Sequence, residues 1–162
     1  MKFKRISTYT LTAIFALLAG CQFIVGDFRH SAVSPGNRIP VKTGGPFSGI
    51  YNDDNLILDY TYRLEGPEMT MHGNLEFLGG IPNFGYMKHF HLQIYFLDDN
   101  GSVLKRTRIF TAGHMREIGA WRFQRRLNTP ADAAAMAFGY SGTAQSNGGP
   151  DEISWDFWHL PN

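Results

Sequence analysis

The chain has 162 residues, of which 15 are basic and 14 acidic, so its formal net charge at pH 7 is +1. This balance lacks the excess of positive charge that is typical of nucleic-acid-binding domains, so we expect no nucleic-acid partner. The single cysteine excludes an intramolecular disulfide framework and any site built from several thiolates. Thirteen Phe, seven Tyr and three Trp provide large apolar side chains for the core of one domain.

The N-terminus has the layout of an export signal. Three basic residues within the first five positions precede an apolar run at residues 11–20, and small residues lead up to Cys21. A transmembrane helix is one alternative, but it needs about 20 apolar residues, and polar residues such as Asp27 follow the cysteine. An apolar first helix of a cytosolic protein is the other. Neither alternative explains the basic start together with the small residues before Cys21.

The four residues Leu18-Ala19-Gly20-Cys21 resemble the lipobox of bacterial lipoproteins. The resemblance implies that residues 1–20 are a signal peptide cleaved between Gly20 and Cys21. It also implies that the sulfur of Cys21 carries a diacylglycerol and that the new amino terminus is acylated, with palmitate as a typical chain. Gln22 replaces the aspartate that tends to retain such proteins at the inner membrane of enteric bacteria, which favours the outer membrane. We therefore expect an outer-membrane lipoprotein of the bacterial cell envelope that faces the periplasm.

The segment after the cysteine is rich in glycine and proline. Cleavage leaves 12 basic residues against the 14 acidic ones, because the three lost charges are all basic. Residues 21–47 contain repeated Gly and Pro and no apolar period, so we expect the lipidated cysteine and a tether there. The alternative is an extended strand that lies on the domain through Ile39 and Val41. In the first interpretation the folded domain spans residues 48–162.

Two stretches with a period of two follow. Apolar residues alternate with polar ones over residues 56–64 and 69–77, which predicts two half-buried strands. Gly66-Pro67 suits the type II′ turn of a hairpin, because glycine accepts the positive φ of its first central position. A shift of one residue would place the apolar side chains on the wrong face. The predicted pairs are Leu64 with Met69, Tyr62 with Met71, Leu58 with Leu75 and Leu56 with Phe77.

A second hairpin is predicted over residues 89–110. Apolar and polar residues alternate up to residue 96, and Asn100-Gly101 is a strong signal for a two-residue turn. The core face would then carry Phe90, Leu92, Ile94 and Phe96. The predicted pairs are Leu92 with Ile109, Ile94 with Thr107, Tyr95 with Arg106, Gln93 with Arg108 and His91 with Phe110.

Three more strands are expected, at residues 121–127, 134–144 and 153–159. About seven strands, short turn signals and no long helix predict an all-β fold. We expect an immunoglobulin-like antiparallel β-sandwich, with a small β-barrel as the alternative.

Histidine and methionine residues suggest a metal site. His89 and His91 would lie on one face of a strand, and with His72 they could bind copper or zinc in an exported protein. The period places Met69 and Met71 in the core instead. Arg106 and Arg108 would share the face of His89 and His91 and would disfavour a divalent cation. A metal-handling protein of the periplasm is therefore the alternative function, and surface histidines without a metal are the first interpretation.

Basic residues gather between positions 105 and 126. If the strands that carry them are neighbours, a cationic sheet face would bind an anionic envelope component or an acidic protein partner, because Arg favours phosphate and carboxylate. The alternative is a solvated face whose charges prevent edge-to-edge pairing. The candidate partner-binding residues are Arg106, Arg108, Arg122 and Arg126, with Tyr95 and Gln93 between them.

No catalytic motif is present. Residues 139–142 lack the G-x-S-x-G pattern of a nucleophile elbow, and His114 has no second histidine at metalloprotease spacing. A hydrolase of envelope polymers would need a pocket that joins distant carboxylates such as Asp59 and Asp156. The sequence thus favours a membrane-anchored, non-catalytic binding or assembly module without a cofactor beyond its covalent lipid.

Overall fold

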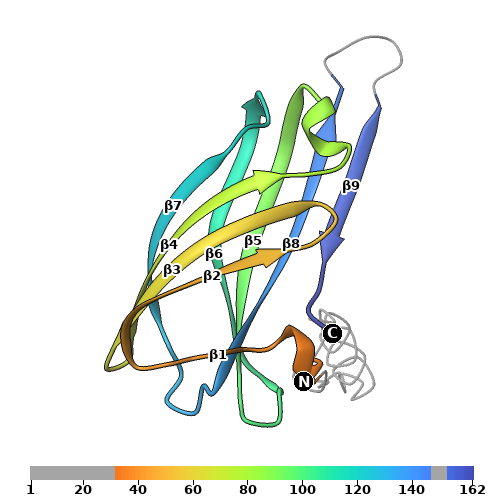
Figure 1. Ribbon diagram of the computed structural model, residues 1–162. Helices are drawn as coiled ribbons and strands as arrows, with labels where there is room; N and C mark the ends of the chain where they lie inside the picture. Colours follow the sequence, from red (N-terminus) through yellow and green to blue (C-terminus); the bar gives the residue numbers. More distant parts are fainter. Residues whose placement is uncertain (1–31, 147–152) are drawn as a thin grey trace, which may run out of the picture.

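The computed structural model describes residues 32–146 and 153–162, which form two antiparallel sheets packed as a sandwich (Figure 1). The lipobox, including Gly20 and Cys21, lies outside these described residues. The strands are β1 (Ile39–Pro40), β2 (Gly44–Asn52), β3 (Leu56–Glu65), β4 (Glu68–Phe77), β5 (Tyr86–Leu97), β6 (Val103–Arg116), β7 (Trp121–Asn128), β8 (Ala135–Gln145) and β9 (Ser154–His159). Two short 3-10 turns are present: η2 (Pro35–Asn37) precedes the first strand, and η3 (Ile81–Asn83) joins β4 to β5.

One sheet has the order β2-β3-β4-β7, and the other has β8-β5-β6 with β1 and β9 on the free side of β8. These last two strands lie end to end, because β1 pairs with the start of β8 and β9 pairs with its second half. The predicted sandwich and its last three strands are confirmed. The immunoglobulin order, in which ABED faces CFG, is not found, since β2, β3 and β4 are consecutive neighbours in one sheet.

The β3–β4 hairpin has the predicted register. Leu64 pairs with Met69, and the three other predicted pairs follow in step to Leu56 and Phe77. Gly66 has the positive φ, 58°, that the turn needs. The alternation of apolar residues and the turn geometry therefore act together to fix this pairing.

The β5–β6 hairpin differs from its predicted register in its distal half. The pairs of Tyr95, Gln93 and Ile94 are confirmed, but Leu92 pairs with Phe110 and His91 with Thr111. The shift arises at Ile109 of β6, which is fully buried. Ile109 has no paired residue on β5, so it forms a β-bulge. The turn also differs: Gly101 N–H donates to the Asp98 carbonyl and Asp98 N–H to the Ser102 carbonyl. Asn100-Gly101 thus ends a three-residue loop, with Gly101 at φ 87°.

The segment predicted to be a tether lies on the sandwich from residue 32 onward. Ala32 bridges to Ser102, Val33 is buried, and Ile39 and Val41 pack against the core. The expected domain boundary at residue 48 falls inside β2. The alternative interpretation, an extended segment on the domain, is the correct one for these residues.

The core lies between the sheets and is rich in aromatic side chains. Phe77 makes edge-to-face contacts with Phe90 and Trp121, at ring-centroid distances of 5.0 and 4.9 Å. Met69 and Met71 are fully buried, as predicted. These contacts bring β4, β5 and β7 together and fix which face of each sheet is turned outward.

Glycine and aromatic residues alternate along one inward row of the four-stranded sheet. Gly49, Tyr60, Gly73 and Phe123 are successive neighbours across β2, β3, β4 and β7. A Cβ at Gly49 would overlap the Tyr60 ring, and a Cβ at Gly73 would overlap the Phe123 ring. Each ring therefore occupies the space that the missing side chain of its neighbour leaves.

Replacement of Gly73 by Ala should destabilise the domain by about 1–3 kcal/mol, because the added methyl group overpacks against the Phe123 ring. Urea unfolding of the purified protein measures the change. Gly36→Ala is the control, since a Cβ there has no atom within 4 Å. Gly73→Ala combined with Phe123→Leu should regain stability relative to Gly73→Ala alone. Equal unfolding midpoints for Gly73→Ala and Gly36→Ala would contradict the packing described.

Candidate functional site

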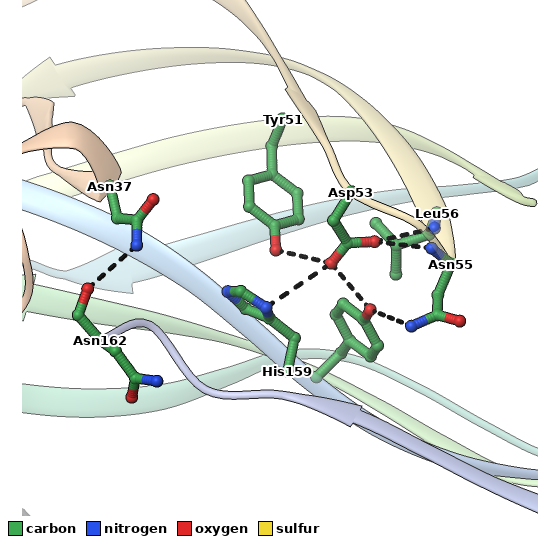
Figure 2. A network of polar contacts seen from close by, with 8 residues as sticks. Asn37, Tyr51, Asp53, Asn55, Leu56, His159 and Asn162 are labelled. Carbon is green, nitrogen blue, oxygen red and sulfur yellow. Dashed lines mark hydrogen bonds and ion pairs between the residues drawn. The ribbon is translucent and has the colours of Figure 1, made fainter.

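The largest polar network of the described residues surrounds Asp53, between β2 and β3 (Figure 2). Its Oδ2 accepts hydrogen bonds from the hydroxyl groups of Tyr51, at 2.9 Å, and Tyr140, at 2.7 Å. Its Oδ1 accepts bonds from the backbone N–H groups of Asn55 and Leu56. His159 places Nδ1 3.8 Å from Oδ2 and stacks on the Tyr140 ring. The network therefore links the β2–β3 turn to β8 and β9 of the other sheet.

This network is a structural latch. Burial raises the pKa of Tyr51 above its ordinary value, and the nearby Asp53 carboxylate adds to the shift. Burial and the hydrogen bond to Asp53 likewise raise the pKa of Tyr140. Both phenols thus stay protonated and donate to the carboxylate at neutral pH. A carboxylate that already accepts four hydrogen bonds is poorly placed to bind a ligand, so we assign it to stability.

The predicted histidine pair lies on the outer face of the five-stranded sheet. The Thr143 hydroxyl donates to Asp156 Oδ1, and its oxygen lies 3.3 Å from His89 Nε2. Because that hydroxyl proton is used, His89 must donate through Nε2. Burial lowers the pKa of the neighbouring His91, and Arg108 and His89 lower it further. His91 is therefore held neutral, with its buried Nδ1 lacking a hydrogen-bond partner among the described residues.

The three candidate metal ligands do not meet. His72 lies on β4 of the four-stranded sheet, opposite Thr61 and Gln124, whereas His89 and His91 lie on β5 of the other sheet. Within the parts of the chain that the structure describes, no group of three or more His, Cys, Asp or Glu residues could hold a metal ion. The structure therefore does not bring His72 together with His89 and His91.

The predicted cationic surface is divided between two faces. Arg106 and Arg108 lie on β6 of the five-stranded sheet, beside Tyr95 and Gln93, while Arg122 and Arg126 lie on β7 of the four-stranded sheet. The condition for one cationic sheet face, that the strands carrying these residues are neighbours in one sheet, is not met. Tyr95 is only 2% exposed, because it packs in a small second core with Val33 and Leu97. Arg126 pairs with Glu68 at 3.9 Å.

A groove of about 550 Å³ crosses the outer face of the four-stranded sheet. We call it the cross-strand groove, because it draws residues from β2, β3, β4 and β7. Two outward rows of paired residues form its floor and walls. One row holds Ser48, Thr61 and His72, and the other holds Ile50, Asp59, Asn74 and Arg122.

Four polar side chains of the cross-strand groove have no partner among the described residues. Among the described residues, no hydrogen bond or ion pair involves the side chains of Asp59, His72, Asn74 or Arg122. Ser48 and Thr61 bond to each other at 2.8 Å between their hydroxyl oxygens. Ile50 is 70% exposed at the β2 end, although it is a large apolar residue on a strand. A volume within the usual range of ligand sites and a set of unpartnered polar groups make this groove a candidate binding site.

Three groove residues were singled out from the sequence, each for a different reason. His72 was a candidate metal ligand, Arg122 part of the cationic surface, and Asp59 a candidate carboxylate of a hydrolase. Asp59 and Asp156 face opposite sides of the sandwich, so the pocket that a hydrolase would need to join them is not formed. The alternation of polar residues indicates which positions face outward, but only the strand order brings these positions together.

Comparison with known proteins identifies no relative: no protein-family model, curated protein or solved structure matches this chain. Among the residues that the structure describes, no helix is long and apolar enough to cross a membrane.

Replacement of Asp53 by Ala should lower the free energy of unfolding by about 2–4 kcal/mol, because two tyrosine hydroxyl groups and two backbone N–H groups lose their acceptor. Denaturant unfolding followed by tryptophan fluorescence measures the loss. Asp54→Ala removes a carboxylate from the adjacent exposed position and should change stability by less than about 0.5 kcal/mol. Comparable losses in the two variants would show that the latch does not stabilise the sandwich.

Proposed function

We propose that this protein is a lipid-anchored, non-catalytic binding module of the bacterial envelope and that the cross-strand groove is its binding site. The observation that carries the proposal is the set of four polar side chains that converge on the groove without partners among the described residues. They stand on paired strands rather than on loops, so their relative positions are held by the sheet. Such a site binds a ligand without having to reorganise.

The lipobox supports the anchor and the envelope location. Leu18-Ala19-Gly20-Cys21, with the basic start before it, resembles the processing site of bacterial lipoproteins. A signal peptide of residues 1–20 and a lipid on Cys21 would place the domain at the outer membrane, facing the periplasm. One acyl chain binds a bilayer only weakly. Stable attachment therefore needs the further acyl chains that a lipoprotein receives on its N-terminal cysteine.

The groove favours binding over catalysis. Ser48 and Thr61 bond to each other, and within the described part of the chain neither hydroxyl bonds to a histidine or carboxylate that could activate it. Metal handling is less well supported, because His89 and His91 are separated from His72 by the whole sandwich. The proposal uses the sandwich architecture alone and not an immunoglobulin-like strand order.

Replacement of Arg122 by Glu should abolish crosslinking of the lipidated protein to its partner in intact envelopes, because it reverses the charge at one end of the groove. A quantitative pull-down after crosslinking measures the effect. Arg126→Glu is the matched control, since Arg126 lies on the same face of the same strand but outside the groove. Both variants should keep the melting temperature of the parent. Partner capture that survives Arg122→Glu, or that fails equally in Arg126→Glu, would remove the groove from consideration.

Replacement of Cys21 by Ser should prevent lipidation and release the protein from the membrane, because the sulfur is the proposed attachment atom. Incorporation of labelled fatty acid and separation of soluble and membrane fractions measure the two effects. Gln22→Ser is a neighbouring change that should leave labelling and membrane attachment intact. Unaltered labelling and fractionation of Cys21→Ser would exclude the proposed anchor.

A further inference from the structure

We infer that the ligand of the cross-strand groove is an uncharged oligosaccharide, which extends the binding function proposed above and depends on it. The inference follows from the hydrogen-bonding capacity of the groove. Asp59 only accepts, Arg122 only donates, and Asn74 does both. His72, Ser48 and Thr61 also offer donors and acceptors, depending on the orientation of their protons. A ligand that matches this mixture must donate and accept repeatedly over a short distance, as sugar hydroxyl groups do.

The charges of the groove argue against an ionic ligand. Arg122 is the only permanently cationic side chain that lines it, and the Asp59 carboxylate lies in the same row of residues, two strands away. A phosphate or a polyanion would be repelled by Asp59, and sites for such ligands gather several cations. A divalent cation would have one carboxylate and no second acidic ligand in the groove. An uncharged ligand is not repelled by Asp59, and it needs no second acidic side chain to bind.

Although much of the lining surface of the groove is made of carbon atoms, its unpartnered polar groups argue against a purely apolar ligand. Ile50 is the one exposed aliphatic side chain among the outward lining residues. Burial of Asp59, Asn74 and Arg122 under an apolar surface would leave their polar atoms without partners, which costs free energy for each atom. Ile50 is suited instead to the C–H face of a sugar ring at the β2 end of the groove.

The direction of the groove distinguishes a saccharide from a strand-like peptide. A peptide that extends a sheet pairs its backbone along an edge strand, here β2 or β7. The outward residues of the groove are arranged at right angles to these edges, from Ile50 on β2 through Asp59 and Asn74 to Arg122 on β7. Three inter-strand spacings separate these positions, or about 14 Å. A short oligosaccharide can cross that distance with hydroxyl groups facing each strand.

The test is a glycan array that carries uncharged and acidic bacterial oligosaccharides, probed with the mature lipidated protein in detergent. Titration calorimetry with the best soluble glycan then gives its Kd. We expect at least one uncharged oligosaccharide to bind. Its Kd should rise at least tenfold in Asp59→Ala and in Asn74→Ala and stay unchanged in Asp132→Ala, which removes an exposed carboxylate outside the groove.

The result separates the inference from the function on which it rests. If no glycan binds, or only acidic glycans bind, the saccharide inference is overturned. If in that case Asp59→Ala still abolishes partner crosslinking in envelopes, the groove remains a binding site for another kind of ligand. If an uncharged glycan binds equally well to Asp59→Ala, Asn74→Ala and the parent, the saccharide site does not lie in the groove and the inference is likewise wrong. If Asp59→Ala changes neither glycan binding nor crosslinking, the proposed function of the groove fails as well.

Discussion

The packing of two sheets through their apolar faces determines which residues of the described domain face outward. Each strand commits alternate residues to the core, so the positions between them must face outward. In the four-stranded sheet this places the glycine–aromatic row, with Gly73 beneath the Phe123 ring, directly beside the outward row that contains Asn74. The same strands therefore supply a tightly packed interior and a polar groove, and the rigidity of the first holds the second in place.

The two open sides of the sandwich are closed by different interactions. On one side the Asp53 network ties the β2–β3 turn to Tyr140 and His159 of the five-stranded sheet (Figure 2). On the other side the edge strands β6 and β7 are bridged by Arg125, which donates to the Ile109 carbonyl, and by Lys105, which donates to the Asn128 carbonyl. Part of the basic cluster in the sequence thus has a structural role that its charge alone did not suggest.

Local patterns predicted more of the fold than of the site. The β3–β4 register followed from the period of two and from Gly66, because both act between residues that are close in sequence. The bulge at Ile109 left no such signal, so the distal pairs of β5 and β6 were wrong. Strand order decides that Arg106 and Arg122 lie on opposite faces of the sandwich. It also decides that Asp59 and Arg122 line the same groove. Strand order is set by long-range packing that a single sequence does not display.

Site-specific photocrosslinking in intact envelopes examines most directly whether the outer face of the four-stranded sheet is the binding surface. A photoreactive amino acid in place of Asn74 reports on the groove, and one in place of Ser141 reports on the outer face of the other sheet. We predict a specific adduct from position 74 and none from position 141. An adduct from position 141 alone, or none from either position, would contradict the assignment of the groove.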